Sequence, residues 1–253
     1  MKRDNFFYIE ETTSTNQLLW QKSSEHCLSE GFTIRTDFQT NGRGQGHNTW
    51  EAEKGKNLLC SLLLFPKRIA INQQFLLSEI VALSVKNVLQ KALGKTVKIK
   101  WPNDIYVREK KIAGILIENK IIGQEFAAAI IGIGLNINQT QFLSNAPNPI
   151  SMKMLCCKDF DIEEIMFSIR EEILSFHEHF DKNSENLQKE YFNSLFRNDN
   201  FYPYKTPEGN FFQAKIEQVL PSGQLVLVDS EAEKHIYNFK EVEFVIEKKQ
   251  INE

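Results

Sequence analysis

The sequence predicts an α+β fold: a mixed β-sheet packed against helices, followed by a small antiparallel β-barrel. Two observations lead to this prediction. Over the first 200 residues, apolar runs with strand spacing alternate with long amphipathic helical patterns. Beyond Asn200 the pattern changes to short strands broken by Pro-Glu-Gly-Asn and Pro-Ser-Gly turns. We therefore expect a larger domain over residues 1–200 and a smaller one over residues 201–253.

The composition is that of an ordinary globular protein. The chain has 253 residues, of which 42% are hydrophobic and 25% charged, and its net charge is -3. This balance provides no overall positive field for nucleic acid. The apolar runs are too short to cross a bilayer, the start lacks a signal-peptide pattern, and the four cysteines have no CxxC spacing. We expect a cytoplasmic protein with reduced thiols and with neither DNA nor a membrane as partner.

Helix and strand patterns alternate in the first part of the chain. Ser14 or Thr15 caps a predicted helix, and residues 31–39 predict a strand that leads into a glycine cluster. Residues 55–65 are nearly all apolar, which indicates a strand buried on both faces. Residues 71–93 predict a long amphipathic helix that a glycine ends.

Four short strands and two helices follow. The strands are predicted over residues 96–101, 104–109, 111–120 and 125–138. The helices are predicted over residues 161–182 and 184–196. Together these elements supply both the sheet and the helices that cover it.

The segment QTNGRGQGHNTW, residues 39–50, holds three of the chain's 12 glycines. It lacks the Gly-Lys-Ser/Thr of a Walker loop, and a strand follows it instead of the helix that a dinucleotide fingerprint opens. A glycine-rich hairpin loop without a ligand is one interpretation. An anion site is the other, because Arg43 is flanked by glycines whose N–H groups can face the same anion.

A second cluster is KWPNDIYVREKKIAGILIE, residues 100–118. Asn103 and Asp104 follow a proline that ends a strand, so their side chains can face a cleft. Asp104 is interpreted either as a turn cap or as a carboxylate for a metal–phosphate complex. Lys110 and Lys111 are adjacent on a strand and point to opposite faces, so at most one of them faces that cleft.

The third cluster is GIGLNIN, residues 132–138, in which Gly132 and Gly134 leave one face of a strand open beside Asn136. The three clusters together describe one cleft with a guanidinium, an ammonium, a carboxylate and exposed backbone. Such a cleft suits a nucleotide phosphate and a second anionic substrate. No Ser-His or Cys-His pair is evident, which favours catalysis by positioning and charge neutralisation.

These motifs, preceded by Ser-Thr-Asn at residues 14–16, occur in the order that is typical of biotin protein ligases, also called biotin–[acetyl-CoA-carboxylase] ligases. The resemblance covers nearly the whole chain. It implies a class II synthetase-like catalytic domain of the biotin/lipoate ligase type and a C-terminal SH3-like barrel. Some members carry an N-terminal DNA-binding domain. Here the motifs begin within the first twenty residues, which resembles the monofunctional form.

The resemblance also implies the chemistry and the partners. Biotin and ATP, with Mg2+ as the metal, would give biotinyl-5′-AMP, and a lysine of a biotin carboxyl carrier domain would then take the biotin. The acceptor would belong to a biotin-dependent carboxylase such as acetyl-CoA carboxylase, and a homodimer stays open. Two alternatives remain: a lipoate or octanoyl ligase-transferase of the same fold, and a non-catalytic biotin-sensing protein.

Residue roles follow from the same resemblance. The implied biotin-binding residues are Ser14, Thr15, Asn16, Gln39, Gly42, Arg43, Gly44, Gln45, Trp50, Lys111 and Gly114. The implied nucleotide-binding residues are Arg43, Trp50, Asn103, Lys111 and Asn136. Lys111 and Arg43 are the implied catalytic residues, and Asp104 is the implied ligand of the Mg2+ that accompanies ATP. The chain departs from many members at Gln45, where an arginine helps them to retain the adenylate.

Overall fold

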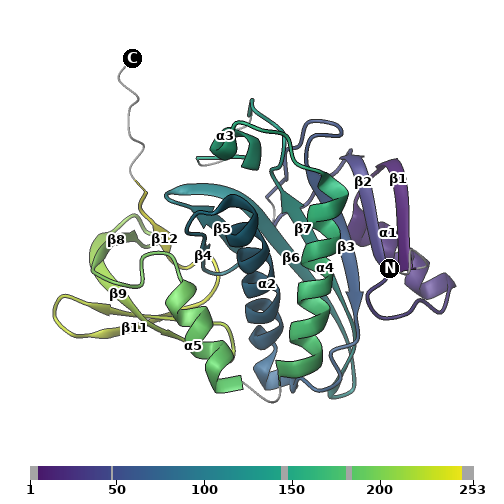
Figure 1. The fold of residues 1–253 in the computed structure, drawn as a ribbon. Helices are drawn as coiled ribbons and strands as arrows, with labels where there is room; N and C mark the ends of the chain where they lie inside the picture. Colours follow the sequence, from purple (N-terminus) through teal and green to yellow (C-terminus); the bar gives the residue numbers. More distant parts are fainter. Residues whose placement is uncertain (1–4, 47, 144–147, 181–183, 247–253) are drawn as a thin grey trace.

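The computed structural model of the chain describes residues 5–46, 48–143, 148–180 and 184–246 (Figure 1). Seven strands form a mixed sheet in the order β1-β2-β3-β7-β6-β5-β4. They are β1 (Phe6–Thr12), β2 (Thr33–Gln39), β3 (Leu58–Leu64), β4 (Lys98–Lys100), β5 (Asp104–Val107), β6 (Lys110–Ile122) and β7 (Glu125–Leu135). Only the β1–β2 pair is parallel among the recorded pairs of this sheet.

Helices cover both faces of the large sheet. They are α1 (Thr15–Glu25), α2 (Phe75–Leu93), α3 (Met152–Cys156), α4 (Ile162–His179) and α5 (Ser184–Ser194). Figure 1 shows α2 and α4 side by side on one face of the sheet, and their apolar residues share a core with Leu58, Leu62 and Leu64 of β3. Leu63 of β3 points the other way and packs with Leu19 of α1. All seven residues of β3 are buried, as its apolar sequence predicts.

The predicted helices and strands lie close to their expected positions. Gly94 ends α2 with a left-handed φ of 60°, a conformation that glycine adopts without steric cost. Ser14 is the N-cap residue of α1, although its side chain makes no capping hydrogen bond. The predicted helix from residue 71 begins with a 3-10 turn, Ile71–Gln73, before α2. Neither β1 nor α3 was predicted from the sequence. Both are short, and β1 lies at the edge of the sheet, where burial imposes no clear alternation.

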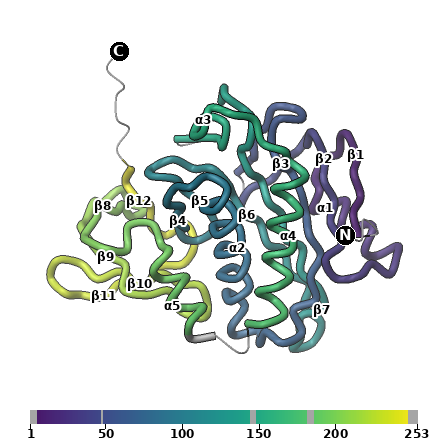
Figure 2. The backbone as a smooth tube through the Cα atoms, viewed as in Figure 1, coloured from purple at the N-terminus to yellow at the C-terminus, as the bar shows by residue number. Residues whose placement is uncertain are grey.

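A second sheet of five antiparallel strands confirms the predicted small β region. It contains β8 (Tyr202–Lys205), β9 (Phe211–Val219), β10 (Leu225–Asp229), β11 (Lys234–Tyr237) and β12 (Glu243–Phe244). The order is β11-β10-β9-β8-β12, so β11 and β12 are its edges within the described residues. Figures 1 and 2 place this sheet beside the β4 edge of the large sheet. The domain division at residue 200 stays a prediction.

An aromatic cluster joins the C-terminal sheet to the rest of the molecule. Phe75 of α2 makes an edge contact with Tyr191 of α5, and Phe239 packs on Trp101 with ring centroids 5.3 Å apart. Trp101 is buried, and its indole Nε1–H donates to the carbonyl of Gly223 at 2.9 Å. A buried indole needs such an acceptor. The cluster therefore fixes the β4–β5 connection against the C-terminal segment.

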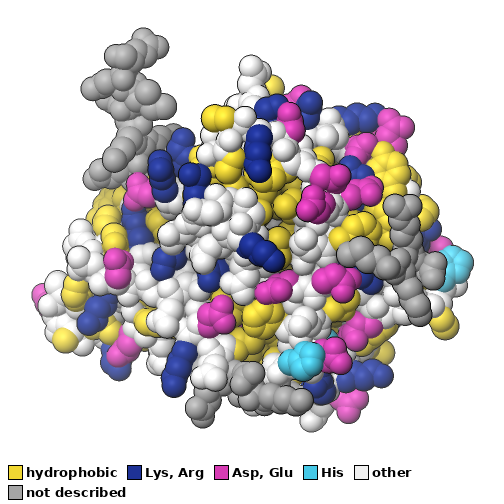
Figure 3. Space-filling view, viewed as in Figure 1, with side chains coloured by type: hydrophobic (Ala, Val, Ile, Leu, Met, Phe, Trp, Pro, Cys, Tyr) yellow, Lys and Arg dark blue, Asp and Glu magenta, His cyan; other side chains and the backbone are white. Residues whose placement is uncertain are grey.

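The surface carries charges of both signs. Lys and Arg side chains are mixed with Asp and Glu side chains over the face drawn in Figure 3. Among the described residues, no helix has both the length and the apolar character needed to cross a bilayer.

The buried carboxyl group of Glu79, on α2, makes the stability of the folded protein depend on pH. The Glu79 side chain is 5% exposed and its Oε2 accepts no hydrogen bond from the described residues. Burial raises the pKa of Glu79 from 4.5 to about 7. Because the folded state binds the proton more tightly than the unfolded chain, ionisation of Glu79 weakens the fold as pH rises between these two values.

We expect Glu79→Gln to remove this penalty. Relative to the Gln variant, the wild-type free energy of unfolding should fall by about 3 kcal/mol between pH 4.5 and pH 7. Urea unfolding of both proteins across this range measures the difference. Glu178→Gln, at an exposed position of α4, is the control. Parallel pH profiles for wild type and Glu79→Gln would contradict the prediction.

Candidate active site

A cavity of about 630 Å³ opens on the face of the large sheet that carries α1. The start of α1, the glycine-rich loop, the β4–β5 connection, β6 and β7 all contribute to its wall. So does the C-terminal segment, through Lys240, Val242, Glu243 and Phe244. Most of the site residues that the sequence predicts lie in this wall: Ser14, Thr15, Asn16, Gln39, Arg43, Gly44, Gln45, Trp50, Asn103, Asp104, Lys111 and Gly114.

Three glycines on β6 and β7 form the floor of the cavity. Gly114 and Gly134 are register partners, and the indole of Trp50 lies on both of them. A Cβ on Gly134 would lie 2.5 Å from Cε2 of Trp50, so close that the indole would have to move. A Cβ on Gly132 would lie 2.5 Å from Oδ1 of Asn16. These glycines line the cavity, and Trp50 and Asn16 occupy part of the face that they leave open; a ligand-binding role for this face stays a prediction.

The start of α1 is held by a polar network. The backbone N–H of Thr15 donates to Oε1 of Gln39 at 2.8 Å. Oγ of Ser61 lies 2.7 Å from Oγ1 of Thr15 and 2.6 Å from Oδ1 of Asn16. Ser61 is a polar residue in the otherwise apolar β3, and it is fully buried. Because a buried hydroxyl needs partners, Ser61 fixes the orientation of both neighbouring side chains.

Glu118 extends this network to the glycine-rich loop. Its carboxylate accepts a hydrogen bond from Nδ2 of Asn16 at 2.7 Å. The guanidinium of Arg43 lies 3.2 Å from the same carboxylate. Arg43 is about one-third exposed, so its charge stays accessible from the cavity. The arginine that the sequence places between two glycines is thus held by an acid from β6.

Lys111 and Asp104 form the second charged pair of the cavity. Nζ of Lys111 lies 2.6 Å from Oδ1 of Asp104 and 5.5 Å from the centre of a Trp50 ring. Lys111 lines the cavity, whereas Lys110 is exposed outside its wall. This agrees with the expectation that at most one of the two adjacent lysines faces the cleft. Asn103 lies beside them, with its Nδ2 donating to the carbonyl of Ile115 at 2.7 Å.

Lys100 is a further cation of the wall that the sequence analysis did not assign to the site. Its Nζ lies 4.8 Å from the ring centre of Phe244, a residue of β12. Burial lowers the pKa of Lys100, and the nearby ammonium of Lys111 acts in the same direction, while Asp104 opposes them. The KWPND motif was the available signal for Lys100, because its first residue is this lysine.

The glycine-rich loop is a closed turn. The N–H of Gly44 donates to the carbonyl of Asn48 at 2.7 Å, and the N–H of Trp50 donates to the carbonyl of Gly42 at 3.0 Å. A Cβ on Gly42 would lie 2.8 Å from the carbonyl oxygen of Trp50, so this position needs glycine for packing. The hydrogen bonds bring Trp50 back over the sheet.

Asn136 and Gly42 are predicted site residues that are not among those lining the cavity. Asn136 is buried, and its Nδ2 donates to the carbonyl of Ile150 at 3.1 Å. That contact holds the segment after residue 148 against the end of β7. A nucleotide-binding role for Asn136 stays a prediction.

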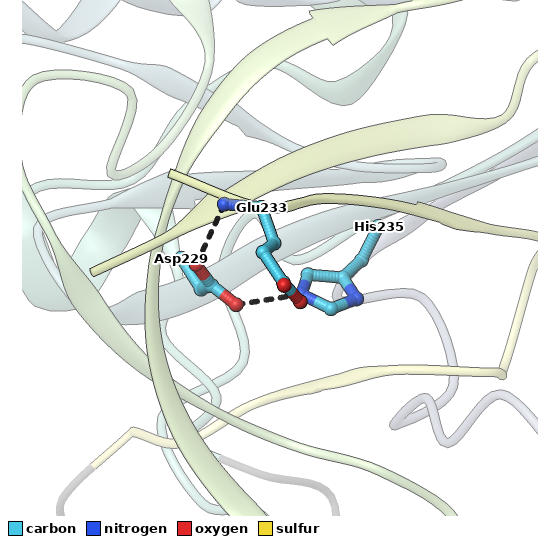
Figure 4. A group of neighbouring side chains, drawn as sticks. All are labelled: Asp229, Glu233 and His235. Carbon is cyan, nitrogen blue, oxygen red and sulfur yellow. Dashed lines mark hydrogen bonds and ion pairs between the residues drawn. The ribbon is translucent and has the colours of Figure 1, made fainter. Parts of the chain in front are cut away.

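A separate group of metal-ligand types lies on the C-terminal sheet, in Asp229, Glu233 and His235 (Figure 4). Oδ1 of Asp229 accepts the backbone N–H groups of Glu231 and Glu233 at 2.9 Å each. Oδ2 lies 2.7 Å from Nε2 of His235. The hydrogen bond from His235 lowers the pKa of Asp229, and the carboxylate closes the β10–β11 turn. These contacts show that Asp229 stabilises this turn.

The chain was compared with known families, proteins and structures. The model of the biotin/lipoate A/B protein ligase family matches residues 8–136, which is just over half of the chain. The bifunctional ligase/repressor BirA of Bacillus subtilis is 33% identical over 129 residues, covering 51% of this chain and 39% of that protein. The biotin–[acetyl-CoA-carboxylase] ligase of Mycobacterium tuberculosis is 28% identical over 134 residues, covering 52% and 48%. The matched segment thus spans less than half the length of these relatives.

Solved structures match over a longer part of the chain. Biotin protein ligase from Aquifex aeolicus in complex with biotin and ATP has a TM-score of 0.78 at 22% identity, covering 95% of this chain and 99% of that one. Biotin protein ligase from Leishmania major in complex with biotinyl-5-AMP has a TM-score of 0.67 at 20% identity, covering 92% and 98%. The shared fold includes the small C-terminal sheet. The chain belongs to the biotin/lipoate A/B protein ligase family.

Proposed function

We propose that this protein is an ATP-dependent ligase that attaches biotin to a lysine of a biotin carboxyl carrier domain. The observation that carries the proposal is the cavity whose wall contains both Arg43 of the glycine-rich loop and Lys111 of β6, together with the glycines of β6 and β7. In the first step a biotin carboxylate oxygen attacks the α-phosphate of ATP, and the bond to the pyrophosphate breaks. In the second step the acceptor amine attacks the acyl carbon, loses a proton and releases AMP.

Charge neutralisation is the main contribution that the cavity can make to the first step. A carboxylate and a triphosphate repel one another, so cations between them lower the barrier as the new bond forms. Lys111 is fixed by Asp104, and Arg43 is fixed by Glu118. Side chains held in this way need little reorganisation when the ligands arrive, which favours catalysis by positioning.

The network at the start of α1 suits the neutral, polar head group of biotin. Its ureido ring presents N–H donors and a carbonyl acceptor, which the Thr15, Asn16 and Gln39 side chains can match. The indole of Trp50 offers an apolar surface beside them. The Mycobacterium tuberculosis relative and both solved structures named above are biotin ligases, which favours biotin over the lipoate that the family description also includes.

Asp104 fits the Mg2+ that accompanies ATP. Magnesium is commonly held in nucleotide sites by one or two carboxylates together with phosphate oxygens and water. Asp104 lies in the cavity wall and has one oxygen directed to Lys111, and Glu243 provides a second carboxylate in the same wall. The metal would neutralise phosphate charge, while the residues above hold and orient the two substrates.

Intact-mass analysis of a carrier domain tests the proposal. The domain is incubated with this protein, ATP, Mg2+ and either biotin or lipoate. We expect a mass gain of one biotinyl group, with AMP as product, and no gain with lipoate. Labelling by lipoate alone would favour the lipoate ligase alternative, and binding of biotin without AMP formation would favour a biotin-sensing protein.

We expect Lys111→Ala to reduce adenylate formation by on the order of a hundredfold, because a preorganised cation beside the reacting phosphate is lost. The adjacent Lys110→Ala is the matched control, since Lys110 is exposed on the same strand. Pyrophosphate release with biotin and ATP measures both rates. Near-normal release by Lys111→Ala would remove this lysine from the proposed mechanism.

We expect Gly132→Ala to weaken biotin binding by at least about tenfold. The added Cβ would displace Asn16 from Ser61 and Glu118, and each lost hydrogen bond costs about 1 kcal/mol. Isothermal titration calorimetry with biotin measures the change.

A double-mutant cycle separates this displacement from a general packing defect. If the alanine acts through Asn16, Gly132→Ala should have little further effect in an Asn16→Ala background. Fully additive losses in the double variant would show that the two positions act independently.

A further inference from the structure

Among the described residues, four cationic side chains line the cavity, and three of them face acids or aromatic rings. Arg43 pairs with Glu118, Lys111 pairs with Asp104, and the half-buried Lys100 lies against the ring of Phe244. Lys240 is the fourth. It is exposed, comes from the C-terminal segment, and has no ion pair with any residue that the structure describes. Its charge is therefore available to an anion in the cavity.

The ammonium of Lys240 lies against the glycine-rich loop. A Cβ on Gly46 would overlap Nζ of Lys240, so in this arrangement the ammonium occupies the space that a side chain at position 46 would take. Gly46 also has a left-handed φ of 67°, which favours glycine independently. The neighbouring residues Gln45 and Phe239 line one small cavity together. The loop and the C-terminal segment thus meet at two pairs of residues, Gly46 with Lys240 and Gln45 with Phe239.

The backbone of Lys240 is held in an unfavourable conformation. Its φ is 70°, in the left-handed region where side chains other than those of glycine, asparagine and aspartate are uncommon. Glycine would adopt this φ without strain, so the lysine side chain is retained here at a cost in stability. Phe239, packed on Trp101 and Phe75, fixes the adjacent residue and so directs Lys240 toward the loop.

We propose that Lys240 binds the phosphate of the acyl-adenylate and thereby holds the glycine-rich loop over it. This inference rests on the proposed function, because the anion concerned is biotinyl-5′-AMP. Lys240 would also supply the positive charge that is missing at Gln45, because the chain lacks a second loop arginine there. Lys54 does not fill that gap, because its Nζ pairs with Glu10 at 2.6 Å, and neither Lys54 nor Lys56 lines the cavity.

The test is the rate at which preformed adenylate leaves the protein. Wild type, Lys240→Gly and Lys240→Arg are each loaded with biotin, Mg2+ and ATP labelled in its α-phosphate, and then chased with unlabelled adenylate. Lys240→Gly removes the ammonium and suits the left-handed backbone, so the fold is preserved. Arg108→Gly is the matched control. This substitution also removes an exposed cation from a residue with a left-handed φ, here 55°. Arg108 does not line the cavity.

We expect Lys240→Gly to release the adenylate about fivefold faster than wild type, a size suited to an exposed charge contact. Lys240→Arg should restore retention, and Arg108→Gly should behave as wild type. The role of Lys240 would be overturned if Lys240→Gly released the adenylate at the wild-type rate, or if Arg108→Gly accelerated release equally. Either result would leave the proposed function intact. Failure of wild type to form any adenylate would overturn both, and the loading step reveals this before the chase begins.

Discussion

The site depends on the absence of Cβ atoms from one face of the β6–β7 pair. Gly114 and Gly134 lie opposite each other in the register, and Gly132 follows two residues away on the same face. Their missing side chains let Trp50 and Asn16 come down onto the sheet. Trp50 closes the glycine-rich loop, and Asn16 connects α1 to Glu118. A side chain added at any of these three glycines would therefore displace the glycine-rich loop or the start of α1, and the sheet itself would change less.

In the cavity, each of the two cations that we propose to be catalytic already has an acidic partner. Glu118 and Asp104 keep Arg43 and Lys111 oriented, and they limit the positive charge that the empty site would otherwise concentrate. Both pairs are partly exposed, so each contact alone contributes little to stability. An arriving carboxylate or phosphate competes with those acids for the same donors. Under the proposed function the pairs act mainly in positioning, since they would hold donors where new charge develops.

The helices and strands that have a strong apolar pattern could be predicted from the sequence. So could the candidate site residues that lie within contiguous motifs. The wholly apolar run at β3 and the helix ended by Gly94 are local signals, and both have direct physical causes. The contact of Asn16 with Glu118 joins residues 102 positions apart, so no local pattern could reveal it. Lys240 was beyond prediction for the same reason. It reaches the cavity because Trp101 and Phe75 pack on Phe239, a tertiary contact between distant segments.

This packing gives the small C-terminal sheet a direct connection to the loop. The sheet is anchored by the buried indole of Trp101, which donates to Gly223, and the segment that follows β11 carries Phe239 and Lys240 to the cavity mouth. Val242, Glu243 and Phe244 then continue along the wall to Lys100. A rigid wall supplied by a separate sheet can hold a cation at a fixed place beside the glycine-rich loop. The chemistry that the large sheet positions is thus enclosed by residues whose placement depends on the small one.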